Sequence, residues 1–477
     1  MKIAEQEAKA FAAAMSALGP FEPAPHIAVA VSGGSDSLAL LVFLRDWLAP
    51  HGGRLTALSV DHGLRPEAAA ECRQVGELVA ALNGGGITAT NGAALPAIDH
   101  HILTWQGTKP ATGLMAAARQ ARYRLLTGWC RSHDVLHLAL AHHADDQAET
   151  VLMRADHGSG AAGLAGMSAL RCQEGVRLLR PLLGWRKHDL IAGLRRRGLS
   201  WIEDPSNRAD RFERVRWRQQ LGEQADIAPL LAEAAASGTR RDGLERLAAR
   251  WLAEQGRVDP HGYVELPLPA VLDAEAELRE QILRQVMEMI GVATFPPAPA
   301  GLAAIIVRLQ ASQSGERTLT ATLGGCLLAV RRGRLSVYRE ADHCDGPIAV
   351  LPGQRLVWDR RFRVRVRSGP AIVADDPGSV PALPGLHVAA LGKYGLRGRS
   401  LPTALKSVPQ PARDALPGLW QGDRLVAVGE IEAVDRPQFS PRNGAAGTFY
   451  KLDVSFLPSR AATSCGFTVV TPTRHTM

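Results

Sequence analysis

The chain has 477 residues, which is too long for one hydrophobic core, so we expect two to four domains. Its hydrophobic content of 46% and charged content of 21% are ordinary for a globular protein, and no apolar run is long enough to cross a bilayer. Six cysteines without a C-x-x-C pair argue against a zinc ribbon or a disulfide framework. The first twenty residues are charged and lack an apolar signal-peptide region, so we expect a cytoplasmic protein.

Strand-like and helix-like segments alternate in the first part of the chain. The strand-like segments are 27–31, 55–60, 135–141 and, more weakly, 87–90. Helical patterns lie between them at 35–48, 66–82 and 112–133. This alternation predicts an α/β domain in which helices cover both faces of a parallel sheet.

The pattern changes after about residue 225. Amphipathic helical segments at 240–255 and 275–292 are followed by β-like runs at 326–340, and the chain beyond 348 is rich in Pro, Gly and Val. We therefore expect an N-terminal parallel-sheet domain, a helical middle region and a small α/β or β-rich C-terminal domain. The predicted boundaries are 1–225, 226–345 and 346–458, and we expect a disordered tail at 459–477.

The first strand runs into the hexapeptide SGGSDS, residues 32–37. Gly33 and Gly34 permit a tight turn with exposed N–H groups, and Ser32, Ser35 and Ser37 add hydroxyl donors, a combination typical of phosphate sites. Asp36 would repel a bare phosphate, so its presence suggests a bridging Mg²⁺. An ordinary glycine turn that begins a helix is the alternative.

Two more polar motifs follow later strands. In SVDHGLR, Asp61 can accept from a ribose or bind a metal, and Arg65 can meet a phosphate, although a simple Asp-capped turn explains both residues as well. In ALAHHADDQAET, two histidines precede Asp145, Asp146 and Glu149, whose spacing lets the carboxylates share a helix face. Helix capping or a two-metal hydrolase site are the alternatives.

Basic residues are concentrated in two places, against a net charge of +8 and a pI near 9.4. Residues 186–218 contain ten Arg or Lys. In RRFRVRVR, the apolar Phe362, Val364 and Val366 alternate with Arg361, Arg363, Arg365 and Arg367, which predicts a strand with one dry and one cationic face. An edge strand protected by charge and a surface for an anionic partner are both consistent with this pattern.

These motifs carry a resemblance to a known family. SGGSDS resembles the signature of the PP-loop ATP pyrophosphatases, which have a Rossmann-like (HUP-type) fold. Within them, the segments VDHGLR, RQARYRLL, AHHADDQAET, GSGAAGLAGM, RPLL and WIEDPSNRADRFERVRWR are similar to the tRNA(Ile)-lysidine synthetases. The resemblance is dense from about 26 to 218, with one departure at Val215, where the family usually has Asn.

The resemblance implies an ATP- and Mg²⁺-dependent ligase. In that family, the wobble cytidine of the CAU-anticodon isoleucine tRNA is adenylated and then joined at C2 to free lysine, with release of AMP and pyrophosphate. It implies that residues 32–37 bind pyrophosphate, that Asp36 binds metal and that Asp61 lines the ATP pocket. Asp146 and Glu149 would orient lysine, bind metal or act as base; this assignment stays open.

The same resemblance assigns roles to several arginines. Arg122, together with Arg119 and Arg214, would neutralise phosphate or steady the base, although surface packing is an alternative for Arg122 and Tyr123. We expect Arg363, Arg365 and Arg367 to contact tRNA, because methionine tRNAs share the CAU anticodon and the enzyme must read other features. Oligomeric state is left open, with a homodimer as one option.

Other functions fit parts of this pattern. A tRNA thiolase needs reactive or cluster-binding cysteines, and a small-molecule amide ligase gives no reason for the basic C-terminal half. A dinuclear metal phosphoesterase leaves SGGSDS without a role, and a non-catalytic tRNA-binding protein explains only the arginines.

Overall fold

The structure is a computed structural model of the chain. It describes residues 2–85, 93–157, 161–202, 217, 226–292, 297–313, 319–368, 385–392, 395, 402–431, 450–456 and 468. These residues form two compact units, one comprising 1–243 with 465–477 and the other comprising 244–464. None of the described helices combines the length and the apolar composition that a bilayer crossing requires.

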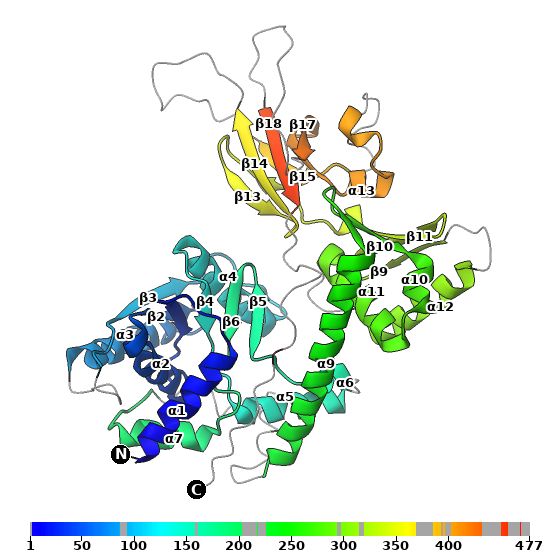
Figure 1. Ribbon diagram of the computed structural model, residues 1–477. Coiled ribbons are helices and arrows are strands. Elements are labelled where there is room, and N and C mark those ends of the chain that lie inside the picture. The colour runs from blue at the N-terminus through cyan, green and yellow to red at the C-terminus, as the bar shows by residue number, and fades with distance from the viewer. Residues whose placement is uncertain are drawn as a thin grey trace, which may run out of the picture. The chain divides into compact units, whose positions relative to one another are not determined.

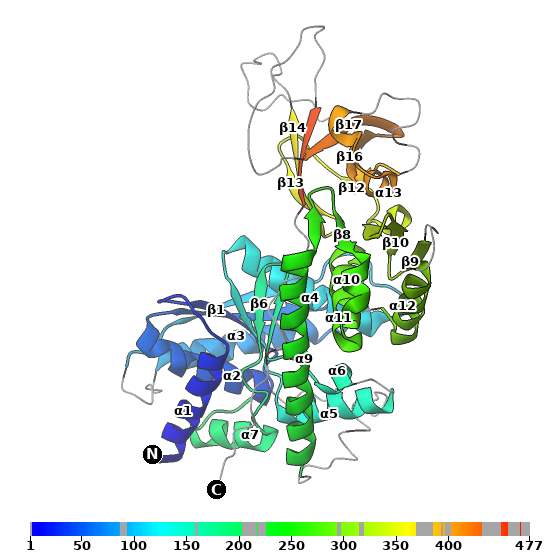
Figure 2. The same ribbon diagram turned by 45° about the vertical axis from the view of Figure 1, so that its right-hand side comes forward.

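The first unit is an α/β domain (Figures 1 and 2). Its strands are β1 His26–Ala30, β2 Arg54–Asp61, β3 Ile98–Thr104, β4 His137–Ala139, β5 Leu170–Gln173 and β6 Val176–Leu179. Its helices are α1 Lys2–Ala17, α2 Ser35–Leu48, η1 Ala49–His51, α3 Ala68–Gly84, α4 Leu114–Ser132, α5 Ala144–Asp156, α6 Ala161–Leu164 and α7 Lys187–Arg196. Helix α9, Ala228–Gln255, begins in this unit and ends in the other.

The strands form one sheet in the order β3-β2-β1-β4-β6-β5, in which only β5 is antiparallel to its neighbour. Ile27 and Val29 of β1 face a core shared with α1, α2, α3 and α7, whereas Ala28 between them faces α4. Since parallel crossovers are right-handed, α4 must lie on the opposite face once the chain moves to the other side of β1. Helices therefore cover both faces, as the alternation of elements predicts.

Most of the predicted elements of this unit are present. Helix α2 has the predicted bounds, and β1, β2, β4, α3 and α4 lie within a few residues of theirs. The weak strand at 87–90 lies outside the described residues, and the sheet's third strand is β3, which the sequence pattern did not indicate. In the predicted tail, Thr468 is described: its N–H donates to Ser168 Oγ, and its carbonyl accepts from the N–H of Ala169.

The second unit contains two sheets. The first has the order β7-β8-β11-β10-β9, packs against α10–α12 and the end of α9, and is antiparallel throughout. The second has the order β12-β15-β16-β17-β18-β14-β13, with only β17 and β18 parallel. The predicted domain division at 226, 346 and 459 stays a prediction, and the region 226–345 contains the first sheet as well as helices.

The bounds in this unit are β7 Arg257–Asp259, β8 Tyr263–Pro267, α10 Leu268–Asp273, α11 Ala276–Gly291, α12 Pro299–Gln313, β9 Leu319–Leu323, β10 Cys326–Arg331, β11 Arg334–Arg339, η3 Ala341–His343, β12 Ile348–Ala349, β13 Arg355–Trp358, β14 Phe362–Ser368, β15 Leu386–Ala390, η4 Thr403–Leu405, α13 Gln410–Asp414, β16 Pro417–Gln421, β17 Arg424–Ile431 and β18 Tyr450–Phe456.

The arginine-rich strand is β14, and it is an interior strand. It pairs with β13 on one side and β18 on the other, so the interpretation as an edge strand protected by charge is wrong. The predicted alternation is present, because Phe362, Val364 and Val366 are fully buried and Arg363, Arg365 and Arg367 are exposed.

Arg361 was predicted to lie on the cationic face and does not. The chain turns at Asp359 and Arg360, both with positive φ, and the strand begins only at Phe362. The buried Arg361 side chain instead donates to the buried Asp359 carboxylate at 2.7 Å, and Arg339 donates to the same carboxylate at 3.1 Å. Arg339 also donates to the Gly291 carbonyl, so this cluster joins β11, α11 and the β13–β14 turn.

Removing the Asp359 carboxylate would leave two buried guanidinium groups without their shared counter-charge. We expect Asp359→Ala to lower the free energy of unfolding by about 3–5 kcal/mol. Urea unfolding followed by circular dichroism measures this, with Asp423→Ala in the exposed β16–β17 turn as the control. Equal unfolding midpoints for the two variants would contradict the role of the cluster.

Candidate active site

The candidate site lies where the carboxyl ends of β1 and β4 diverge. Strands β2 and β3 lie to one side of β1, and β4 and β6 lie to the other. The direction in which successive strands are added across the sheet therefore reverses between β1 and β4. Open parallel sheets bind ligands at such a switch point. A cavity of about 910 Å³ opens there, lined by the segments that follow β1, β2 and β4 and by residues of α4 and α7. Its size suits a nucleotide.

The loop after β1 is shaped by Gly33. This residue has φ +86°, and its carbonyl accepts from the N–H of Ile202 at 3.0 Å. A Cβ at position 33 would lie 2.6 Å from Ile202 Cδ1. Glycine is therefore required both by the backbone conformation and by the close approach of the segment that contains Trp201 and Ile202.

The serines of the loop hold its shape and leave the start of α2 open. Ser37 Oγ donates to the Gly34 carbonyl at 3.0 Å, and the N–H of Ser32 donates to Ser37 Oγ at 3.2 Å. Gly34 is the N-cap of α2 and has no side chain to bond the first helical N–H groups. The positive end of the helix dipole therefore faces the cavity without a side-chain cap, which favours an anion.

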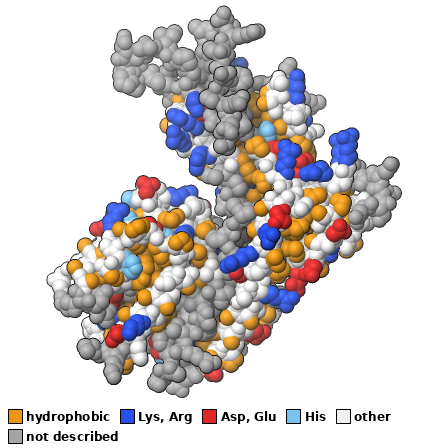
Figure 3. Space-filling view, in the orientation of Figure 1, with side chains coloured by type: hydrophobic (Ala, Val, Ile, Leu, Met, Phe, Trp, Pro, Cys, Tyr) orange, Lys and Arg blue, Asp and Glu red, His pale blue; other side chains and the backbone are white. Residues whose placement is uncertain are grey.

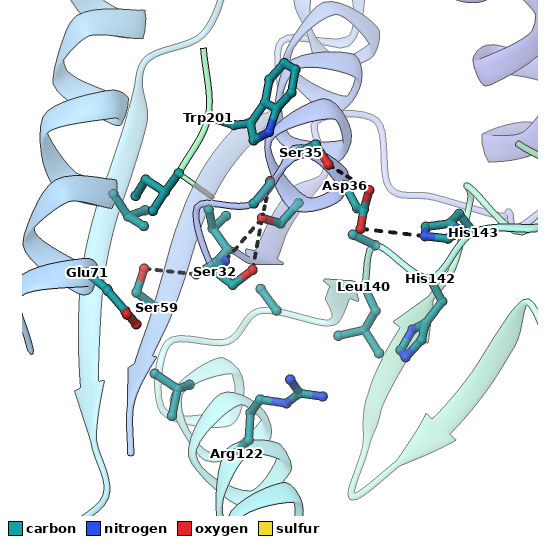
Figure 4. A pocket seen from close by; sticks show the side chains of 18 of the residues that line it. Ser32, Ser35, Asp36, Ser59, Glu71, Arg122, Leu140, His142, His143 and Trp201 are labelled. Atoms are coloured by element: carbon teal, nitrogen blue, oxygen red, sulfur yellow. Dashed lines mark hydrogen bonds and ion pairs between the residues drawn. The ribbon is translucent and has the colours of Figure 1, made fainter. Parts of the chain in front are cut away.

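Asp36 lies between two cationic groups. Its Oδ2 is 3.6 Å from His143 Nε2, the residue it faces in Figure 4, and 3.4 Å from Lys187 Nζ. Burial by itself would raise the pKa of Asp36, but the hydrogen bond and attraction to His143 and the charge of Lys187 lower it to about 2. The loop therefore presents an ionised carboxylate.

His143 is a buried cation at the start of α5. Its side chain is 2% exposed, and burial alone would lower its pKa; attraction to Asp146 and hydrogen bonds to Asp145 and Asp36 raise the pKa to about 10. The N–H of His143 also donates to Asp146 Oδ2 at 3.1 Å, which caps the helix. The structure thus gives Asp146 a capping bond, and Asp146 is not among the residues that line the cavity.

Asp145 connects α5 to α7. Its two oxygens accept from Arg186 Nε at 3.0 Å and from the N–H of Lys187 at 2.8 Å. Burial opposes its ionisation, but His143, the Lys187 amide and Arg186 hold the pKa of Asp145 well below its usual range. Glu149, one turn further along α5, is 1% exposed and lines the cavity.

Arg122 enters the cavity from the opposite wall. Its side chain points from α4 toward the β1 loop (Figure 4), and its guanidinium lies 5.7 Å from the Tyr123 ring centre. Arg119 contacts the same ring at 5.2 Å but is exposed and does not line the cavity. Burial raises the pKa of Tyr123, but Arg119, Arg180 and Arg122 together lower it.

The remaining predicted residues lie apart from this group. Asp61 accepts from the N–H of Gly63 at 2.8 Å, as a turn-forming Asp does, while its neighbours His62 and Arg65 line the cavity. Arg214, Val215 and the EDPSN segment at 203–207 lie outside the described residues. Arg363, Arg365 and Arg367 belong to the second unit.

Sequence reasoning missed the contribution of α7. Lys187, His188, Ile191 and Arg195 all line the cavity, at a spacing that places them along one side of the helix. In the sequence, the basic run from residue 186 is visible only as a local concentration of charge. Nothing in the local sequence pairs Lys187 with Asp36, 151 residues away.

Comparison with known proteins decides the family. A family model described as a PP-loop domain matches residues 3–225. The tRNA(Ile)-lysidine synthase of Ruegeria pomeroyi is 35% identical, over 85% of this chain and 88% of its own length. That of Bradyrhizobium diazoefficiens is 37% identical over 71% of this chain and 93% of its own length.

This chain belongs to the tRNA(Ile)-lysidine synthase family. A further relative with the same name, from Rhodopseudomonas palustris, is 42% identical over 52% of this chain and 65% of its own. The resemblance that the motifs suggested is thereby confirmed, and the parallel-sheet domain is the family's PP-loop domain.

The two loop glycines give a matched test of the phosphate-loop geometry. Gly33→Ala forces a positive φ and a clash with Ile202, so we expect a loss of about 2–4 kcal/mol of stability. Gly34 has φ −70°, and its added Cβ would meet only Ser32 Oγ at 3.9 Å. Thermal unfolding of Gly34→Ala should therefore match the wild type, and equal melting temperatures for both variants would disprove the requirement at Gly33.

Proposed function

We propose that this protein is a tRNA(Ile)-lysidine synthetase, which uses ATP to join lysine to C2 of the wobble cytidine in the CAU-anticodon isoleucine tRNA. One observation carries the proposal: the SGGSDS loop and the acidic start of α5 line one cavity at the switch point of a PP-loop domain. The relatives are named tRNA(Ile)-lysidine synthases, a name that gives the tRNA and the modified base. We also propose a cytoplasmic location, where tRNA, ATP and free lysine are available.

The first step is adenylation of the base. The C2 oxygen of cytidine attacks the α-phosphorus of ATP, and the bond from that phosphorus to pyrophosphate breaks. Residues 32–37 bind the pyrophosphate through the N–H groups of the loop and of the α2 start. Arg122 on the opposite wall neutralises charge that develops at the α-phosphate. His62 lines the cavity and borders the ATP site, and Asp61 shapes the turn that carries His62.

Asp36 fits a magnesium ligand of a particular kind. In the described part of the chain, no three His, Cys, Asp or Glu side chains converge as a ready-made metal cage. Mg²⁺ in nucleotide enzymes is commonly held by one or two carboxylates together with phosphate oxygens. The ionised Asp36 beside the phosphate loop matches that arrangement, and the bound ion would offset phosphate charge.

The second step needs a deprotonated lysine. The free side chain has a pKa of about 10.4, so its ammonium must lose a proton before the amine displaces AMP at C2. Glu149 supports this role best, since its carboxylate is buried and lines the cavity. Asp146, which caps α5, positions that helix and with it Glu149.

A thiolation reaction on the same fold is less well supported. Cys72 lines the cavity, but burial and the nearby Asp61 and Glu71 raise the pKa of its thiol to about 11. The reactive form of cysteine is the thiolate, so this thiol is a poor nucleophile at neutral pH.

The exposed face of β13 and β14 is the proposed tRNA surface, and Figure 3 shows basic side chains gathered there. Arg365 is paired in register with Arg355 of β13, and Arg363 is exposed beside them. Arg367 differs, because it forms an ion pair with Asp453 of β18. Arg355 therefore joins Arg363 and Arg365 as a phosphate contact, and Arg367 contributes less than the sequence suggested.

Asp36→Ala tests the catalytic assignment. It should reduce tRNA-dependent pyrophosphate release by about 100-fold or more, because the loop loses its metal ligand. The measurement is AMP and pyrophosphate formation with lysine and CAU-anticodon tRNA present together or omitted singly. Asp156→Ala at the exposed end of α5 is the control. Near-normal turnover in Asp36→Ala would refute the loop assignment, and turnover without tRNA would refute the function.

Salt dependence tests the tRNA surface. Arg363→Gln combined with Arg365→Gln should weaken tRNA binding and reduce the slope of log K against log salt by roughly one to two. Arg367→Gln alone should change the slope less, because Asp453 already neutralises that guanidinium. Filter binding across a salt series measures both. A slope that the double substitution leaves unchanged would remove this face from the interface.

A further inference from the structure

The phosphate loop has no cation of its own, which is unusual for a site that must hold pyrophosphate. Residues 32–37 contain no Lys or Arg, and their one charge is the negative Asp36. Arg122 lies on the opposite wall of the cavity, beyond the loop (Figure 4). Two cationic side chains are described beside Asp36: Lys187, with its Nζ 3.4 Å from the carboxylate, and the buried His143, with its Nε2 at 3.6 Å.

Lys187 is held in place by its backbone. It is the first residue of α7, and its N–H donates to Asp145 Oδ2, while Leu190 and Leu194 anchor the helix in the core. The side chain takes no part in this anchoring. The side chain lines the cavity and is 42% exposed. Its ammonium can therefore change position while the fixed backbone keeps it close to the loop.

We propose that Lys187 supplies the cation that the phosphate loop lacks and contacts the pyrophosphate group of ATP as it leaves. This inference rests on the proposed function. As the cytidine oxygen bonds to the α-phosphorus, the electron pair of the breaking bond passes to pyrophosphate. The Lys187 ammonium stays protonated and offsets that added charge, so it stabilises the transition state more than the ground state.

The contact with Asp36 marks where Lys187 rests before ATP binds. The Lys187 and Asp36 side chains are 42% and 29% exposed, so both charges remain partly hydrated and their ion pair at 3.4 Å is weak. Exchange of the carboxylate for phosphate oxygens therefore costs little. The same exchange releases Asp36 from one cation, so that its carboxylate becomes available when nucleotide and metal arrive together.

Other residues of α7 fit this role less well. Arg195 lies two turns further along, with its guanidinium 5.9 Å from the Trp201 ring centre. His188 is 3.1 Å from Asp189 of the same helix. Arg186 is engaged with Asp145. Lys187, by contrast, forms an ion pair with Asp36 of the phosphate loop.

The test compares Lys187→Met, Lys187→Arg and Lys9→Met in the full-length protein. Lys9→Met removes the same charge from an exposed i,i+4 pair on α1. The first readout is binding of inorganic pyrophosphate with Mg²⁺ by calorimetry, and the second is single-turnover pyrophosphate release with ATP and tRNA. We expect Lys187→Met to weaken pyrophosphate binding at least tenfold and to slow release about 100-fold. Lys187→Arg should recover most of both, and Lys9→Met should match the wild type.

The outcomes separate this inference from the proposed function. Unchanged pyrophosphate binding and release in Lys187→Met would overturn the inference, and a lower melting temperature with unchanged binding would assign Lys187 a structural pairing with Asp36 only. If the wild type binds pyrophosphate through Lys187 but never releases it in a tRNA-dependent way, the proposed function fails while the role of Lys187 stands.

Discussion

The site depends on one topological constraint: the reversal of strand order between the parallel neighbours β1 and β4. Right-handed crossovers place α2 and α3 on one face of the sheet and α4 on the other, so the segments that leave β1 and β4 separate. The starts of α2 and α5 then border the same opening, and α4 closes its opposite wall. Asp36 and Asp146, 110 positions apart in the sequence, both contact His143 for this topological reason.

The buried charge of His143 keeps these helix starts together. Its ring lies within 3.6 Å of carboxylates from the first turns of both α2 and α5. Asp145 continues the connection to the start of α7 through Arg186 and the Lys187 amide. A neutral imidazole would leave the three carboxylates to repel one another in a poorly hydrated site, so the cation and the arrangement of the helices depend on each other.

Local patterns predicted the elements well and the partners poorly. The bounds of α2 follow from a loop of turn residues and an uninterrupted apolar run, and the alternation in β14 follows from strict period two. Strand β3 was missed because IDHHILT, mostly exposed in the structure, lacks an apolar face. Arg361 was misplaced because period two does not show that the chain turns at Asp359 and Arg360. The Lys187–Asp36 contact depends on tertiary structure alone.

The arginines of β14 illustrate why charge in a sequence is not yet a binding surface. Identical residues at alternate positions have three different environments: Arg361 is buried against Asp359, Arg367 is paired with Asp453, and Arg365 stands in register with Arg355. The first two have their counter-charge within the protein, so an added phosphate gains little from them. Like charges on neighbouring strands destabilise a sheet, and an external anion would relieve that cost for the Arg355–Arg365 pair, even though Arg365 also stands in register with Asp453 of β18. Arg365 lies on the interior strand β14, where edge protection is irrelevant, and its repulsion by Arg355 of the edge strand β13 is therefore an argument for a polyanionic partner.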